Sequence, residues 1–177
     1  MKKLLLHSVA ALSLMTISTE SSAAGTNPLI SGPQGQYGTL PFTSLTPADY
    51  KEGVLEGIRL QNQEVEAIVN QRSIPTFENT IVALDRSGEV LDRSVLALSN
   101  LEHAMGDTVM MRVLAEVTPE LSRHNTDIIL NEALWNRIKS VYDNSGKDTS
   151  LSSEDLRLIK KTYDAFLTSG ANLTGEA

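Results

Sequence analysis

The stretch Pro75-Thr76-Phe77-Glu78-Asn79-Thr80-Ile81-Val82-Ala83-Leu84-Asp85-Arg86-Ser87-Gly88 has the pattern of a helix start. Proline disfavours helical geometry in the residue before it, and the Thr76 hydroxyl can cap the first turn. Glu78 suits the electropositive beginning of a helix. From here an apolar stripe continues at near-heptad spacing, through Phe77, Ile81, Leu84, Gly88, Leu91, Val95, Leu98, Leu101 and Met105. The stripe predicts one long helix over Phe77–Met105 that packs in a hairpin with a neighbour, a coiled coil being the alternative.

Gly88 is the unusual member of this stripe. A glycine inside a helix costs about 0.5–1 kcal/mol relative to alanine. We therefore expect another backbone to approach the helix closely at Gly88.

Helix signals also precede and follow this segment. Thr46-Pro47-Ala48-Asp49 combines a capping hydroxyl, a proline at the first helical position and an acid in the first turn. It predicts a helix over 47–70, whose apolar stripe is interrupted only by Gln61. A third helix carries Val109, Val113, Val117 and Leu121, and Pro119 should kink it or split it near Thr118.

The C-terminal third of the chain predicts two shorter helices. Asn131 caps a helix that runs to Tyr142, and a loop follows over 143–151. The last helix starts at Ser152 or Ser153 with a capping box to Asp155, and Gly170 stops it. Its expected core face comprises Leu156, Ile159, Tyr163 and Phe166. Since no useful strand alternation appears, the predicted fold class is all-α, with long antiparallel helices behind an extended N-terminal arm.

The N-terminal residues have the pattern of a secretory signal. Lys2 and Lys3 precede an apolar run over 4–15, and small residues over 21–24 offer a cleavage site. A membrane anchor is the alternative, but the run is shorter than the roughly 20 apolar residues that span a bilayer. We expect a signal peptide over 1–24, and hence export to the bacterial periplasm or beyond the cell. An extended arm rich in glycine and proline follows over 25–45, packed across the body or flexible, and the helical domain covers 46–177.

The composition narrows the classes of partner. The chain has 177 residues, no cysteine and a formal net charge of −7. An acidic surface disfavours nucleic acid and anionic membranes as partners. Without cysteine, packing alone must hold the fold of an exported protein. After signal cleavage we expect no membrane association.

No group of residues has the pattern of a catalytic or metal site. Neither His103 nor His124 is part of a His-Glu-x-x-His turn, the arrangement that presents two imidazoles and a general base to zinc. The two could meet in space, but surface or packing roles fit them better. The acidic residues of the two central helices recur at helical spacing, and we predict that they form a solvated face with Arg86 and Arg93. A catalytic carboxylate pair among them is the less favoured alternative. The acidic residues are Glu64, Glu66, Glu78, Asp85, Glu89 and Asp92. Aromatic residues on apolar faces, Trp135, Tyr142 and Tyr163, are assigned to the core. We predict no catalytic, cofactor-binding or metal-binding residue.

Taken in order, several segments resemble the thimet-oligopeptidase-like zinc metallopeptidases, most closely their peptidyl-dipeptidase (dipeptidyl carboxypeptidase) branch. The strongest match is Pro75 to Gly88; the others are Asn27-Pro28-Leu29, Leu40-Pro41-Phe42, Pro47-Ala48-Asp49-Tyr50, 119–124, Asn131-Glu132-Ala133-Leu134-Trp135, 137–143 and Gly170-Ala171-Asn172-Leu173. The resemblance implies the N-terminal part of a longer, mostly helical enzyme with a deep channel. It also implies a zinc site beyond the end of this chain, so we expect the chain to be truncated before the catalytic domain.

Three functions remain open on this reading. The first is the N-terminal segment of an exported zinc metallopeptidase that removes C-terminal dipeptides from, or otherwise cleaves, short oligopeptides. Its partners would be those peptides and the missing catalytic domain, and the segment alone would be inactive. The second is an independent exported helical bundle that binds a peptide or protein without catalysis. The third is a structural or decayed product of a truncated gene.

Overall fold

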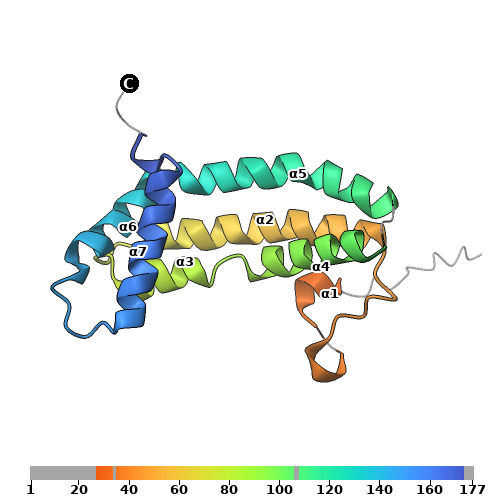
Figure 1. Cartoon of the computed structure of the whole chain (residues 1–177), viewed down its shortest axis with the longest axis horizontal. Helices are drawn as coiled ribbons and strands as arrows, with labels where there is room; N and C mark the ends of the chain where they lie inside the picture. Colours follow the sequence, from red (N-terminus) through yellow and green to blue (C-terminus); the bar gives the residue numbers. More distant parts are fainter. Residues whose placement is uncertain (1–26, 34, 106–107, 174–177) are drawn as a thin grey trace, which may run out of the picture.

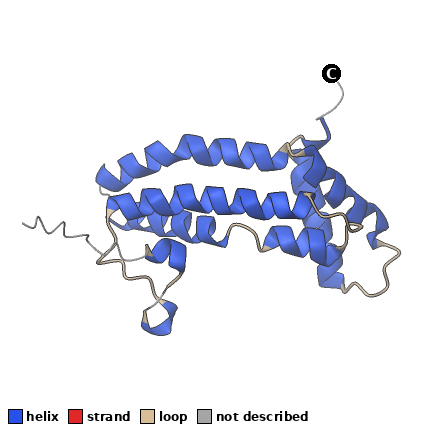
Figure 2. Cartoon of the chain, turned by 180° about the vertical axis from the view of Figure 1, so that it is seen from behind, coloured by secondary structure: helices blue, strands red, loops and turns tan. Residues whose placement is uncertain are grey.

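A computed structural model describes residues 27–33, 35–105 and 108–173. Over these ranges it contains helices, turns and loops but no strand (Figure 2), which confirms the predicted all-α class. The elements in order are α1 (Pro28–Ser31), η1 (Gln36–Gly38), α2 (Pro47–Val69), η2 (Phe77–Val82), α3 (Ala83–Asp85), α4 (Glu89–Met105), α5 (Thr108–Ile129), α6 (Glu132–Ser145), α7 (Ser153–Thr168) and η3 (Ala171–Leu173). The expected signal peptide over 1–24 lies outside the described residues. Among the described helices, none is long and apolar enough to cross a membrane.

Three long helices, α2, α4 and α5, lie side by side along the longest axis of the molecule (Figure 1). Successive helices run in opposite directions, as predicted. Helices α6 and α7 pack across one end of this layer, and α1 lies against the other end (Figure 1). The Thr46–Asp49 capping box forms at the start of α2, so this helix begins as its sequence indicates.

Close packing between α2 and α4 depends on a glycine that the apolar stripes do not mark. A Cβ on Gly57 would lie 2.6 Å from the Leu91 Cα and 2.7 Å from the Leu91 backbone nitrogen. Since real Cβ atoms do not approach a backbone so closely, only glycine allows the two helix axes this separation. The close approach expected at Gly88 is therefore found one helix earlier, at Gly57.

The prediction of one continuous helix over Phe77–Met105 is wrong. A π-helical turn, η2, begins at Phe77 after the capping residue Thr76 and leads into the short α3. The chain then turns at Gly88, whose φ of +83° belongs to the left-handed region, and α4 starts afresh at Glu89. Glycine adopts this φ at no steric cost, so the residue that interrupts the stripe also interrupts the helix.

Helix α5 continues through Pro119, contrary to the predicted split near Thr118. The proline removes one backbone donor, whose acceptor would be the carbonyl of Ala115 on the exposed side of the helix. Buried side chains before and after the proline, Val117 and His124, hold both halves of α5 against the body. Packing therefore outweighs the missing hydrogen bond.

The C-terminal helices follow most of their predicted signals. Asn131 caps α6 by accepting from the Leu134 N–H at 2.9 Å, and α6 extends three residues beyond the predicted end at Tyr142. The Ser152–Asp155 capping box is present, and Gly170 has φ +92° after the end of α7. One expected core residue, Leu156, is instead exposed, in the first turn of α7.

The arm over 25–45 is not wholly extended. Asn27 caps the one-turn helix α1 through the Leu29 N–H, and the Leu29 side chain is fully buried. The first described residues therefore pack on the body. The expectation of a non-helical arm is wrong over 28–31 and at η1.

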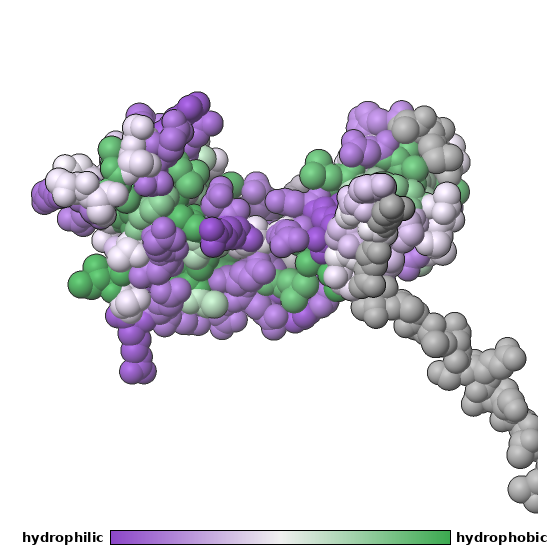
Figure 3. All heavy atoms as spheres, turned by 90° about the horizontal axis from the view of Figure 1, so that it is seen from below, coloured by the Kyte–Doolittle hydropathy of each residue, from purple (hydrophilic) through white to green (hydrophobic). Residues whose placement is uncertain are grey.

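Buried apolar side chains form two separate cores. The α1-side core lies between α1, α2, α4 and α5 and comprises Leu29, Tyr50, Val54, Leu91, Ala97, Leu98, Met110, Val113 and Val117. The α6-side core comprises Val65, Ile68, Ile81, Leu134, Trp135, Ile138, Val141, Ile159, Phe166 and Ala171. In the space-filling view two lobes with apolar surface are joined by a narrower, mostly hydrophilic waist (Figure 3). Helix α2 spans both cores.

Candidate functional site

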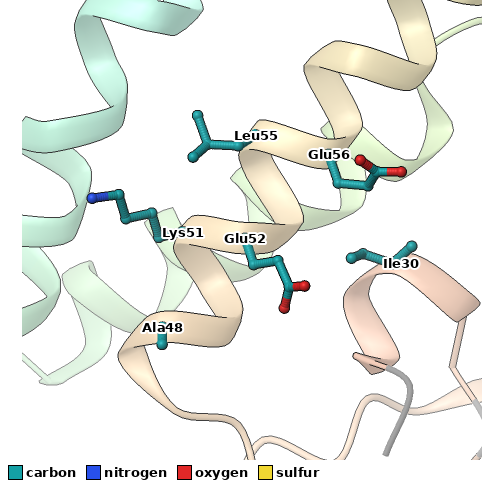
Figure 4. Close-up of a pocket in the computed structure, with 6 residues that line it drawn as sticks. All are labelled: Ile30, Ala48, Lys51, Glu52, Leu55 and Glu56. Atoms are coloured by element: carbon teal, nitrogen blue, oxygen red, sulfur yellow. The ribbon is translucent and has the colours of Figure 1, made fainter. Parts of the chain in front are cut away.

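A surface groove lies between α1 and the first half of α2. It measures about 570 Å³ and is lined by Ile30, Ala48, Lys51, Glu52, Leu55 and Glu56 (Figure 4). The helix repeat places Glu52 and Glu56 on the side of α2 that faces α1, while Lys51 extends toward α5 (Figure 4). We call this feature the α1–α2 groove.

The charged groups of the α1–α2 groove have structural partners. Lys51 Nζ lies 2.8 Å from Glu116 Oε2 on α5, and Glu56 pairs with Arg59 one turn further along α2. The Arg59 hydrogen bond lowers the pKa of the Glu56 carboxyl, and Glu52 accepts from the Asn27 amide at 3.1 Å. Among these residues there is no nucleophile beside a general base.

A second polar feature lies between the two cores, at the α3–α4 turn. The Gln61 Oε1 lies 2.7 Å from His124 Nε2 on α5, and the Gln61 Nε2 donates to Ser87 Oγ at 3.3 Å. The Gly88 N–H donates to Glu64 Oε2 at 2.7 Å. These residues, Gln61, Glu64, Ser87, Gly88 and His124, join α2, the α3–α4 turn and α5, and we call them the polar seam.

The hydrogen-bond directions fix the protonation of His124. Ser87 Oγ donates its one proton to the Leu84 carbonyl at 2.7 Å, so it must accept from the Gln61 amide. The Gln61 oxygen then faces His124, and the imidazole must donate from Nε2. In the neutral ring His124 Nδ1 then carries no proton, and this atom is buried without a partner among the described residues.

Burial lowers the pKa of His124, with Asp127 on the same helix acting in the opposite direction. His124 is 5% exposed, whereas the His103 side chain is 80% exposed near the end of α4. The sequence predicted surface or packing roles for the two histidines; His124 is packed inside the body and His103 lies on the surface. The described residues bring no three His, Cys, Asp or Glu side chains together, so they do not form a zinc-binding set.

Two arginines have roles that helical spacing did not indicate. Arg93 was assigned to a solvated face, but its side chain is only 16% exposed and donates to the carbonyls of Leu29 and Ile30 at 2.9 and 3.2 Å. It therefore fastens α1 to α4. Arg137 is 7% exposed and donates from α6 to the Gln71 carbonyl and to Asn79 Oδ1.

The predicted core aromatics lie together. Tyr163 stacks on Tyr142 with ring centroids 3.9 Å apart and on Trp135 at 5.1 Å. Of the predicted acidic face, Glu64 is drawn into the polar seam and Glu89 pairs with Arg93. The signal that could have located the seam was Gln61, the one polar residue in the α2 stripe.

Sequence comparison gives the relatives of this chain. No protein-family model matches it. It is 32% identical over 151 residues to a dipeptidyl carboxypeptidase of Salmonella typhimurium, which covers 85% of this chain and 22% of the relative. It is 30% identical over 132 residues to a dipeptidyl carboxypeptidase of Escherichia coli, covering 75% of this chain and 19% of the relative.

The chain thus spans about a fifth of the length of the curated relatives it matches. Its similarity extends over most of the helical body and is not confined to the stretch Pro75 to Gly88. The resemblance noted from that stretch is therefore confirmed: this chain is similar in sequence to the dipeptidyl carboxypeptidases.

Proposed function

We propose that this chain is the N-terminal helical segment of an exported zinc metallopeptidase that removes C-terminal dipeptides from short oligopeptides. The observation that carries the proposal is the similarity to two dipeptidyl carboxypeptidases along most of this chain. Both relatives are about five times as long as the matched region, which leaves ample length for a catalytic domain.

The site chemistry supports a scaffold role within such an enzyme. The described residues form no zinc-binding set, and both described histidines have structural surroundings. Zinc and the general base would therefore be supplied by residues outside this chain. We expect the chain alone to release no dipeptide.

In this proposal the three long helices form part of one wall of a substrate channel. A rigid wall of packed helices would exclude folded proteins and admit short peptides. The tight α2–α4 contact at Gly57, the Arg93 contact from α4 to α1 and the Arg137 contact from α6 to Gln71 support the rigidity that such a wall requires. The signal over 1–24 would direct the enzyme to the periplasm or outside the cell.

A chimera tests the proposal. The matched fifth of the Salmonella typhimurium enzyme is replaced by residues 27–173 of this chain, and dipeptide release from an N-acetylated hexapeptide is measured by mass spectrometry. We expect the chimera to release dipeptides, while the same enzyme without the segment and this chain alone release none. Dipeptide release by this chain alone, or undiminished release without the segment, would refute the scaffold role.

The size-exclusion role has its own readout. The intact chimera should cleave the hexapeptide and leave a folded protein with an accessible C-terminus uncut. Cleavage of both substrates at similar rates by the intact chimera would show that the helices do not restrict access.

A further inference from the structure

The polar seam lies where the two cores meet. Leu91 of the α1-side core follows Ser87 and Gly88 by one turn, and Val65 of the α6-side core follows Gln61 by one turn. Across this boundary the contact from α5 to α2 includes a directional bond, His124 to Gln61. The orientation of one lobe relative to the other therefore depends on a few polar atoms as well as on α2 itself.

The Nε2–H can donate to Gln61 in either protonation state of His124, but the surroundings of Nδ1 favour only the neutral ring. With Nε2 donating to Gln61, a second proton must enter at Nδ1, which is buried and has no acceptor among the described residues. A buried charged donor without an acceptor is strongly unfavourable. Protonation at Nδ1 therefore destabilises the imidazole in its present position.

A groove beside the seam offers the protonated ring another position. It measures about 420 Å³ and is lined by Gln61, Leu91, Asp92, Val95, Leu121, His124, Asn125 and Ile128. Its Asp92 carboxylate from α4 is exposed to solvent. An imidazolium that turned into this groove could contact water and a carboxylate. In its buried position the Nδ1 atom is shielded from water and contacts no carboxylate among the described residues.

The charged groups around His124 come from all three helices. Helix α5 contributes Asp127, Glu120 and Arg123, helix α2 contributes Glu64, and helix α4 contributes Asp92. Four of these five are acids, which favour the imidazolium once it leaves the buried position. Glu64 is held by the Gly88 N–H and does not approach the unpartnered Nδ1 within hydrogen-bonding distance.

We propose that the His124–Gln61 hydrogen bond is a pH-sensitive latch that couples the two lobes, and that protonation of His124 opens it toward the Asp92 groove. Opening releases the second half of α5 from α2 and leaves each core intact. This inference concerns the chain's own conformation and does not depend on the proposed peptidase activity.

The sign of the pH dependence follows from burial. An unfolded histidine titrates near pH 6.5, and burial holds the folded pKa of His124 below that value. Between the two pKa values the open or unfolded chain binds more protons than the latched chain. The latch is therefore fully stable above about pH 6.5 and weakens as the pH falls through the folded pKa.

Nitrogen NMR of the imidazole rings in the full chain tests the latch directly. We expect His124 at pH 7.5 to show a proton on Nε2 and none on Nδ1, and to titrate below pH 6.5. Amide hydrogen exchange, corrected for its intrinsic pH dependence, should speed up over 120–129 and at Gly88 as His124 becomes protonated. Exchange in the α6-side core should change much less.

Two matched variants separate the latch from general acid sensitivity. His124→Gln keeps an amide donor for Gln61 and cannot titrate, so its exchange over 120–129 should no longer respond to pH. His103→Gln removes the exposed histidine and should keep the wild-type response. An Nδ1–H tautomer, a His124 pKa at or above 6.5, or an unchanged pH response in a folded His124→Gln would overturn the proposal. If His124→Gln does not fold, the wild-type ring titration and exchange still decide it.

Discussion

Gly88 packs directly on the side chain of Gln61. A Cβ at position 88 would lie 2.4 Å from Gln61 Nε2, and the φ of Gly88 is +83°. The same glycine thus ends the α3 turn and leaves room for the amide that joins Ser87 to His124. The helix break and the buried hydrogen-bond network both depend on the absence of a side chain at Gly88.

Gly88→Ala should therefore be strongly destabilising. The left-handed backbone costs an L-residue about 1–2 kcal/mol, and displacement of Gln61 adds the loss of a buried hydrogen bond, about 1 kcal/mol. We expect urea unfolding to show a loss of about 2–3 kcal/mol from the two effects together. Gly146→Ala is the matched control, because its φ is −67° and nothing lies within 4 Å of a Cβ there. Equal losses in the two variants would contradict this role for Gly88.

Arg137→Met should loosen the segment between α2 and η2. The guanidinium donates to the carbonyls of Gln71 and Ser73 and to Asn79 Oδ1, and its removal leaves these acceptors without the donor. We expect a loss of about 1–3 kcal/mol, together with faster protease cleavage over 70–76. Arg123→Met, which removes an exposed pair with Glu120, should change stability by less than about 0.5 kcal/mol. Undiminished protection of 70–76 would show that Arg137 does not hold it.

Arg93→Met should release α1 from the body. Two backbone carbonyls of α1 lose their donor, while the buried Leu29 side chain and the bonds from the Asn27 amide to α2 still hold the helix turn. We expect amide exchange at Ile30 and Ser31 to rise more than tenfold, with a smaller effect on the α6-side core. Arg59→Met removes an exposed arginine paired within α2 and serves as the control. The same exchange increase in both variants would argue against a specific fastening role.

The stacked rings make Trp135 a reporter of the α6-side core. It is the one tryptophan in the chain, and its neighbour Tyr163 packs between it and Tyr142. Tyr163→Ala should cost about 3 kcal/mol through the cavity it leaves and shift the Trp135 emission to longer wavelength. Tyr163→Phe keeps the stack and should preserve both stability and emission. A large red shift in Tyr163→Phe would mean that the hydroxyl, and not the stack, shields Trp135.

Signals local to a few residues predicted the helix ends well. The capping pairs at Thr46 and Ser152, the cap at Asn131 and the stop at Gly170 are all found, since each depends on atoms within one turn. The all-α fold class was predicted from the helical spacing of the apolar residues. The break at Gly88 was missed because an apolar stripe records which residues face inward and contains no information on a single φ.

The polar contacts between helices were less accessible to sequence reasoning. Arg93 and Arg137 have long side chains whose heads lie far from their own helix face, so helical spacing could not assign their partners. Gln61 did interrupt the α2 stripe and could have pointed to a buried polar contact. Its partners, Ser87 and His124, are 26 and 63 residues away, a distance that one sequence does not resolve.

The reading frame of the native transcript beyond codon 177 tests the central claim most directly. If the chain is the helical segment of a zinc dipeptidyl carboxypeptidase, the frame should continue for several hundred codons and encode a His-Glu-x-x-His turn. A stop codon at that point, with no such sequence in frame, would contradict the claim.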